Sequence, residues 1–214
     1  MSPKVKTVYV CRECGYESAK WLGKCPSCNA WNTLEEEIAV PVKSGSVTRI
    51  SASAASATPL SKISIGDEPR YVTGIGELDR VLGGGIVKGS VTLLSGDPGI
   101  GKSTILLQIC KALENSLKIL YVSGEESAAQ IKMRAGRLGA ESDSVSVMTE
   151  TDVLSVCEYI KSSKPDLVMI DSIQTMQIAE LSSSPGSIVQ VRESTNMLLR
   201  TGKALEIPII IVGH

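Results

Sequence analysis

Residues 71–214 alternate short apolar runs with amphipathic stretches, the pattern of a parallel α/β sheet whose strands are connected by helices. The apolar runs predict buried strands, and the stretches with apolar residues three or four positions apart predict helices. The predicted strands cover residues 91–95, 118–123, 145–148, 167–171 and 207–212. The predicted helices cover residues 75–82, 102–115, 127–138, 152–162 and 188–202.

Two segments before this region have a different character. Residues 1–36 hold four of the six cysteines and predict a small zinc-binding ribbon. Residues 37–70 are rich in Ser, Ala and Pro and predict a flexible linker, with a short strand near residues 62–65. Residues 71–214 then form the α/β core, which we expect to be truncated at its C-terminal side because the chain stops directly after a strand.

Composition limits the possible functions. The 214 residues are 43% hydrophobic, enough for one full domain with a small module. The longest apolar run is far shorter than the ~20 residues of a membrane span, and no apolar signal segment opens the chain, so we expect a cytoplasmic protein without membrane contact. The net charge of −1 means that any DNA contact must come from a local patch or an assembled ring.

Residues 96–103 fit the phosphate-binding loop (P-loop) template at every required position. Glycines let backbone N–H groups turn toward phosphate oxygens, and the following helix points its positive end at the same anion. Lys102 is expected to act on the β- and γ-phosphates of ATP, and Ser103 to bind Mg²⁺. The expected nucleotide-binding residues are Gly96, Asp97, Pro98, Gly99, Ile100, Gly101, Lys102, Ser103 and Thr104.

Further polar residues are expected at this edge of the sheet. Asp171 ends an apolar strand, the Walker B pattern, and should hold Mg²⁺. Ser172 follows where many ATPases carry a catalytic glutamate, so the base that activates water must lie elsewhere. We favour Glu125 over Glu126 as this base, and the alternative is that both form the acidic first turn of a helix. His214 could sense the γ-phosphate.

The pairs Cys11/Cys14 and Cys25/Cys28 are two CxxC knuckles, a pattern typical of four-thiolate zinc sites. A rubredoxin-like iron centre is the chemical alternative. Residues 1–34 carry five basic and two acidic side chains, which is weak support for nucleic-acid binding. Trp21 and Trp31 could stack on bases, but we prefer the interpretation that they cover the metal site of a module too small for its own core. Cys110 and Cys157 are expected to be inert core residues.

Together these motifs resemble those of the bacterial RadA (Sms) DNA-repair proteins, in which a RecA-like P-loop core follows a zinc finger. The likeness spans essentially the whole chain, and the combination of motifs is specific where each motif alone is not. The residues that carry it are Cys11-x2-Cys-Gly, Trp21-x-Gly-Lys-Cys-Pro-x-Cys-x2-Trp31, Thr73-Gly-Ile-Gly-Glu-Leu-Asp-Arg-Val-Leu-Gly-Gly-Gly85, the P-loop, Ser123-Gly-Glu-Glu-Ser127, Asp171-Ser-Ile-Gln-Thr175 and Val212-Gly-His214.

The resemblance implies a DNA-stimulated ATPase that forms a homo-hexameric ring, binds single-stranded and branched DNA, cooperates with a RecA-type recombinase and drives branch migration. It implies that Glu125 is the catalytic glutamate and that residues 172–187 face DNA. It also implies that the strand before His214 lies between the P-loop and Walker B strands. Relatives continue with a Lys-Asn-Arg-Phe-Gly motif and a Lon-protease-like domain, so we expect weak hydrolysis from this chain. The alternative function is a zinc-ribbon adaptor with a nucleotide-dependent switch of the circadian-clock ATPase type.

Overall fold

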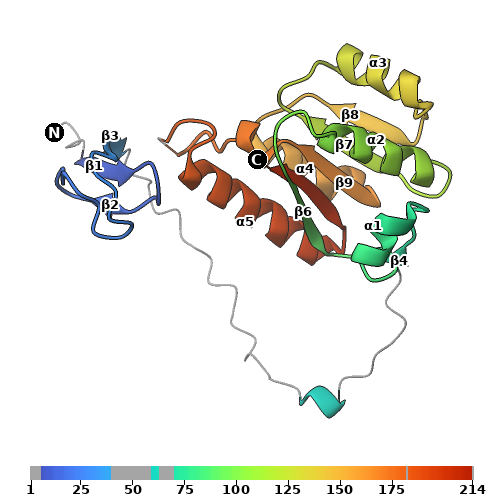
Figure 1. The fold of residues 1–214 in the computed structure, drawn as a ribbon, viewed down its shortest axis with the longest axis horizontal. Helices are drawn as coiled ribbons and strands as arrows, with labels where there is room; N and C mark the ends of the chain where they lie inside the picture. The colour runs from blue at the N-terminus through green and yellow to red at the C-terminus, as the bar shows by residue number, and fades with distance from the viewer. Residues whose placement is uncertain (1–5, 40–58, 63–69, 182, 214) are drawn as a thin grey trace.

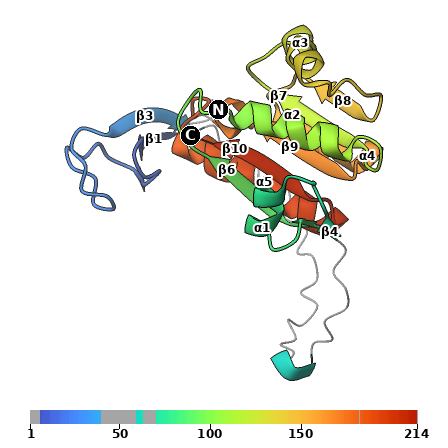
Figure 2. The ribbon, with the colours of Figure 1, turned by 45° about the vertical axis from the view of Figure 1, so that its right-hand side comes forward.

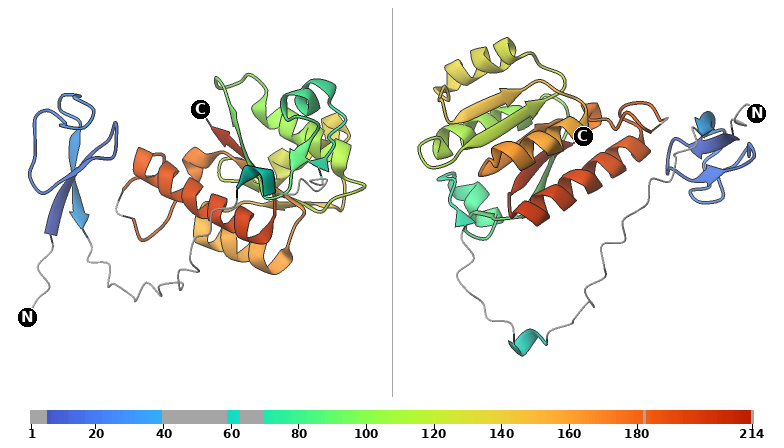
Figure 3. Two further views of the ribbon diagram at one scale, coloured as in Figure 1. Left: turned by 90° about the horizontal axis from the view of Figure 1, so that it is seen from below. Right: turned by 180° about the vertical axis from the view of Figure 1, so that it is seen from behind.

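The computed structural model describes residues 6–39, 59–62, 70–181 and 183–213. The first of these parts is a three-stranded antiparallel sheet in the order β2-β1-β3, with β1 at Lys6–Cys11, β2 at Glu17–Ser18 and β3 at Leu34–Ala39. It is held by its own small cluster of buried side chains around Cys11, Cys25 and Leu34. Figures 1 and 3 show this ribbon beside the N-terminal end of α5 (Ile188–Leu205), where Gly15 lies next to Val189.

The core is a five-stranded parallel sheet in the order β6-β10-β9-β7-β8. Its strands are β6 (Val91–Ser95), β7 (Ile119–Ser123), β8 (Val145–Met148), β9 (Leu167–Asp171) and β10 (Ile209–Gly213). Every strand predicted for the core is therefore confirmed to within two residues at each end. The last strand lies between β6 and β9, as the resemblance implied.

Helices cover both faces of this sheet (Figures 1 and 2). Along the central strands the side chains alternate between two apolar clusters, as the period of two in a strand requires. One cluster joins the sheet to α2 (Lys102–Leu113) and α3 (Ala128–Leu138) and contains buried Cys110. The other joins it to α4 (Val153–Ser163) and α5 and contains buried Cys157. Both cysteines are core residues, as expected.

Helix starts follow from capping side chains. Ser127 and Asp152 accept hydrogen bonds from backbone N–H groups of the first turns of α3 and α4, and each precedes its helix by one residue. Ser187 caps α5 in the same way. The predicted end of α5 at Gly202 was wrong, because the helix continues to Leu205. The glycine is needed there for a different reason: a Cβ would lie 2.9 Å from the carbonyl oxygen of Ile207.

A short hairpin and two single turns complete the described chain. Strands β4 (Arg70–Tyr71) and β5 (Ile86–Val87) pair antiparallel and flank α1 (Gly76–Val81). A 3-10 turn, η1, covers Leu60–Lys62, so the strand expected near residues 62–65 is wrong at Lys62, and its remaining residues lie outside the described part. A second 3-10 turn, η2 (Ile173–Thr175), follows β9 directly. Among the described residues, the helices are too short or too polar to cross a bilayer.

Candidate nucleotide site and metal centre

A cavity of about 420 Å³ opens at the carboxyl edge of the parallel sheet, where β6, β7 and β9 end. Ligands of open α/β sheets bind at this edge, outside the carboxyl ends of the strands. Residues from four separate sequence motifs line it, although they lie up to 114 positions apart. The lining residues are Pro98, Gly99, Gly101, Lys102, Ser103, Thr104, Ser123, Glu125, Glu126, Arg134, Asp171, Ser172 and Val212.

The P-loop connects β6 to the first turn of α2. Gly99 and Gly101 have φ angles of 80° and 105°, in the left-handed region that favours glycine. Space does not require glycine at either position, since a Cβ there would meet nothing within 4 Å. The backbone conformation is what favours glycine, because residues with a Cβ rarely adopt these positive φ angles. These angles turn the loop into the N-terminus of α2. Predicted residues Gly96, Asp97 and Ile100 do not line the cavity, and the Ile100 side chain is largely exposed.

Lys102 is the first residue of α2 and is buried, with 7% of its surface exposed. Its ammonium donates hydrogen bonds to the carbonyl oxygens of Gly96, at 2.6 Å, and Asp97, at 2.9 Å. The positive charge is therefore already held over the loop by backbone groups. A phosphate oxygen bound in the P-loop would compete with these two carbonyl oxygens for the Lys102 ammonium.

Asp171 ends β9 and is positioned by a residue that sequence reasoning missed. Tyr121, on the neighbouring strand β7, donates a 2.6 Å hydrogen bond from its hydroxyl to Asp171 Oδ2. The Tyr121 ring is buried, and burial together with the nearby Asp171 charge raises the pKa of the phenol. The hydroxyl thus keeps its proton and acts as a donor. One sequence signal pointed to it: Tyr121 carries the only polar side-chain group in the apolar run that precedes Ser123.

The two adjacent glutamates lie in different surroundings. Glu125 Oε1 accepts a 3.1 Å hydrogen bond from the hydroxyl of Ser172, the residue after Asp171. Glu126 Oε1 instead forms a 2.6 Å ion pair with Arg134 of α3, a cavity residue that the sequence did not single out. The alternative interpretation of both glutamates as an acidic first turn is wrong, because α3 begins at Ala128 and its first turn holds no acidic residue.

Gly124, which precedes Glu125, permits a close approach between two loops of the site. A Cβ on Gly124 would overlap the side chain of Thr175 in η2 and would lie 3.0 Å from Thr151. The Thr175 hydroxyl itself donates to the carbonyl oxygen of Ser172, at 2.8 Å. The segment that carries Glu125 and the turn that follows Asp171 are therefore packed directly against each other. His214, the remaining predicted site residue, lies outside the described residues.

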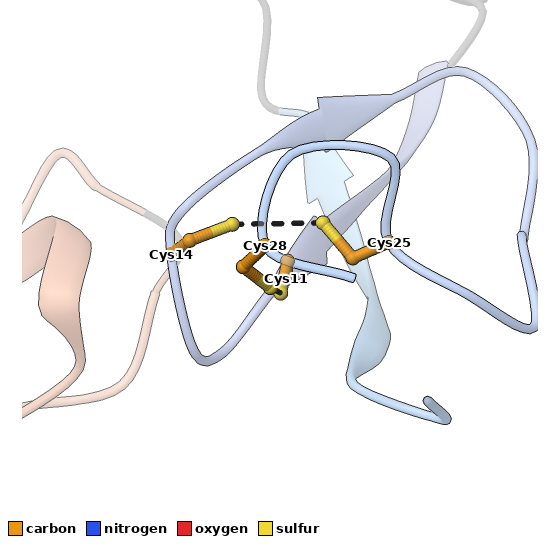
Figure 4. Close-up of side chains that lie close together, drawn as sticks. All are labelled: Cys11, Cys14, Cys25 and Cys28. Atoms are coloured by element: carbon orange, nitrogen blue, oxygen red, sulfur yellow. Dashed lines mark hydrogen bonds between the residues drawn. The ribbon is translucent and has the colours of Figure 1, made fainter. Parts of the chain in front are cut away.

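The four knuckle cysteines converge on one point (Figure 4), and their sulfur atoms all lie within 4.8 Å of one another. The Cys14–Cys25 and Cys11–Cys28 sulfur distances are 3.5 Å and 3.7 Å. A disulfide needs about 2.05 Å, whereas a tetrahedral ZnS₄ shell with 2.3 Å bonds places its sulfurs about 3.8 Å apart. The donor set therefore fits a zinc ion.

The thiols of the cluster do not ionise equally in the absence of a cation. A backbone hydrogen bond from Ala30 favours the Cys28 thiolate, but burial and the other three cysteines outweigh it and raise the pKa of Cys28 to about 12. Burial disfavours the Cys11 thiolate, but hydrogen bonds from the Thr33 hydroxyl and from backbone N–H groups outweigh it and lower the pKa of Cys11 to about 6. The interpretation of the tryptophans as a cover for the metal site was wrong. Trp21 and Trp31 are 54% and 69% exposed, and the apolar residues that pack around the cysteines are Tyr9 and Leu34.

Comparison with known proteins gives two family matches and a set of whole-chain relatives. Residues 9–36 match the family described as "Rubredoxin metal binding domain", and residues 71–155 match the ATPase family described as "KaiC". Proteins named "DNA repair protein RadA" match nearly the whole chain. The one from Bacillus subtilis is 47% identical over 99% of this chain, and those from Haemophilus influenzae and Halalkalibacterium halodurans are 45% and 50% identical. The chain spans about half the length of these relatives, between 47% and 48%.

Proposed function

The chain belongs to the RadA family of DNA repair proteins over the half of their length that it spans, and on this premise we propose that it is the ATPase part of a DNA-dependent recombination and repair motor. In this proposal the protein hydrolyses ATP, binds single-stranded DNA and promotes branch migration of recombination intermediates. The observation that carries it is the convergence of the P-loop, Asp171 and Glu125 on one cavity. Residues 71–214 would form this motor core, with residues 1–36 as the zinc ribbon and 37–70 as the linker.

The loop and the first turn of α2 would hold the triphosphate of ATP. The amides of Gly99, Gly101 and the helix N-terminus supply donors for phosphate oxygens, and Lys102 would exchange its two carbonyl partners for the β- and γ-phosphates. Ser103 and Asp171 both line the cavity and offer oxygen ligands to Mg²⁺, which neutralises phosphate charge when bound. Tyr121 would fix one Asp171 oxygen and leave the other directed to the metal or its waters.

Glu125 is the better candidate for the general base. Its carboxylate lies beside Ser172, next to the metal-binding Asp171, while the Glu126 carboxylate is paired with Arg134. A base must reach the attacking water near the γ-phosphate, and a carboxylate already neutralised by an arginine is a weaker acceptor of its proton. His214 stays a prediction as γ-phosphate sensor.

The zinc ribbon would be structural, because all four ligands come from the protein and leave no open coordination position. Its thiols must stay reduced to bind metal, which agrees with a location in the cytoplasm. We further propose a homo-hexameric ring and a RecA-type recombinase as partner for the full-length protein.

The test is ATP hydrolysis with Mg²⁺, measured as phosphate release with and without single-stranded DNA, on this chain and on a full-length form. We expect DNA to stimulate turnover by the full-length form, and Glu125→Gln to remove the stimulated rate while ATP binding persists. The KaiC match favours a second candidate, a zinc-ribbon adaptor whose nucleotide site is a regulatory switch. A switch would bind ATP with no response to DNA, and that result would reject the motor.

A further inference from the structure

The zinc ribbon exposes two large aromatic rings that its own fold does not use. Trp21 and Trp31 are 54% and 69% exposed, and they are the only tryptophans in the sequence. Both belong to the segment around the second knuckle, where Lys24 and Trp31 form an isolated antiparallel bridge. Tryptophan is costly to leave in water, and the apolar side chains that pack against the buried cysteines are those of Tyr9 and Leu34. The two rings are therefore available to a ligand.

Positive charge accompanies these rings. The Lys24 ammonium lies 5.6 Å from the centre of the Trp31 ring, a cation–π arrangement. Among residues that the structure describes, Lys20 and Lys24 take part in no ion pair. The acidic side chains Glu13 and Glu35 instead pair with Arg12. The tryptophan segment thus presents two exposed aromatic rings together with two lysines, and the ammonium of Lys24 lies beside the Trp31 ring.

We propose that Trp21, Lys24 and Trp31 form a stacking site for unpaired bases of single-stranded DNA. In this site bases stack on the exposed indole faces, while Lys24 and Lys20 contact the flanking phosphates. The inference rests on the proposed function, because it identifies where on the zinc ribbon the single-stranded DNA of that function would bind.

Two arguments select this ligand. Aromatic rings combined with positive charge recognise single strands, since every unpaired base has an open face and every linkage a phosphate, whereas a duplex keeps its base faces stacked. A protein partner fits less well, because the centres of protein interfaces are depleted of lysine, and here a lysine lies over Trp31, the more exposed of the two rings.

Intrinsic fluorescence tests the site directly, because both tryptophans of the chain lie in it. Zinc-loaded protein without nucleotide is titrated with a fluorescein-labelled oligo-dT, and tryptophan emission and fluorescein anisotropy are recorded together. An abasic oligonucleotide of equal length is the control for charge alone. We expect oligo-dT to quench tryptophan emission along the same curve as the anisotropy rise, and the abasic strand to bind more weakly with little quenching.

Single substitutions separate the contribution of base stacking from that of the phosphate contact. Trp31→Ala should weaken oligo-dT binding about five- to 150-fold, the range for loss of one stacked base. Lys24→Gln should reduce the slope of log K against log salt by about 0.7, the value for one phosphate contact on a single strand. The matched control is Tyr159→Ala, which removes an aromatic ring that is 42% exposed on α4 and should leave the affinity unchanged. Unaltered zinc content shows that each ribbon variant is folded.

The outcomes separate this inference from the proposed function. An anisotropy rise without quenching, or a Trp31→Ala protein of normal affinity, places the DNA elsewhere and overturns the stacking site; the exposed rings would then serve a protein partner. Absence of any anisotropy change, with binding of a fluorescent ATP analogue intact, counts against DNA binding by this chain as a whole.

Discussion

Replacing Tyr121 with phenylalanine removes one hydroxyl from the buried side of the nucleotide site and leaves the ring in place. The lost 2.6 Å hydrogen bond joins a buried phenol to the Asp171 carboxylate. Hydrogen bonds to charged groups contribute about 1.5–3 kcal/mol. Asp171 is only partly buried, so water can replace part of the bond, and we place this one near the lower end of that range, at about 1.5 kcal/mol. For a core of this size we expect the apo melting temperature to fall by about 3–6 °C.

The same substitution should weaken Mg²⁺ binding more than it lowers the stability of the fold. Removing a partner that orients a metal-binding side chain typically costs about 10–100-fold in metal affinity. The assay is the Mg²⁺ concentration at half-saturation for binding of a fluorescent ATP analogue, alongside thermal unfolding without nucleotide. Tyr159→Phe, which loses the hydroxyl of an exposed tyrosine on α4, is the matched control. A Tyr121→Phe protein with wild-type melting temperature and wild-type Mg²⁺ dependence would refute the positioning role.

Four further outcomes are expected. Glu125→Gln should bind ATP but lower phosphate release by about 10²–10⁴-fold; undiminished turnover would remove Glu125 as the base. Lys102→Ala should abolish ATP binding in calorimetry while lowering the apo melting temperature by only a few degrees, because the loop carbonyls it leaves are open to water; a large drop would contradict this. Elemental analysis should find about one zinc per chain, lost in Cys28→Ser, and iron or no metal would overturn the zinc assignment. Hydrogen bonding from Ser155 lowers the pKa of Asp152, so its stabilisation holds above the ordinary carboxylate pKa and is lost as the pH falls through the lowered value. Asp152→Ala should therefore cost about 1 kcal/mol at neutral pH, and chemical denaturation should show this difference shrinking below about pH 4.

Local sequence patterns were enough to predict the strands of the parallel sheet and the starts of the helices that cover it. Strands such as β9 are buried on both faces and read as unbroken apolar runs, and Ser127 and Asp152 mark helix starts because a cap acts within three residues of itself. The P-loop was likewise predictable, since its conformation depends on its own glycines.

Features that depend on contacts between distant segments were not predictable in the same way. The role of Gly202 depends on β10, the hydroxyl of Tyr121 on the end of β9, and the partner of Glu126 on the second turn of α3. Each requires the sheet order and register to be known first. The exposure of Trp31 belongs to the same class, because it depends on which side chains fill the small space around the cysteines.

The missing side chain at Gly124 has a mechanical consequence. Thr175 packs tightly against the α-carbon of Gly124 and Ser172 donates to Glu125, so the peptide that carries Glu125 and the turn that follows β9 are in direct contact. Any shift of that turn by more than a few tenths of an ångström must carry Glu125 with it or break the contact. A displacement of the segment after β9 would thereby be transmitted to the carboxylate that we propose as the general base.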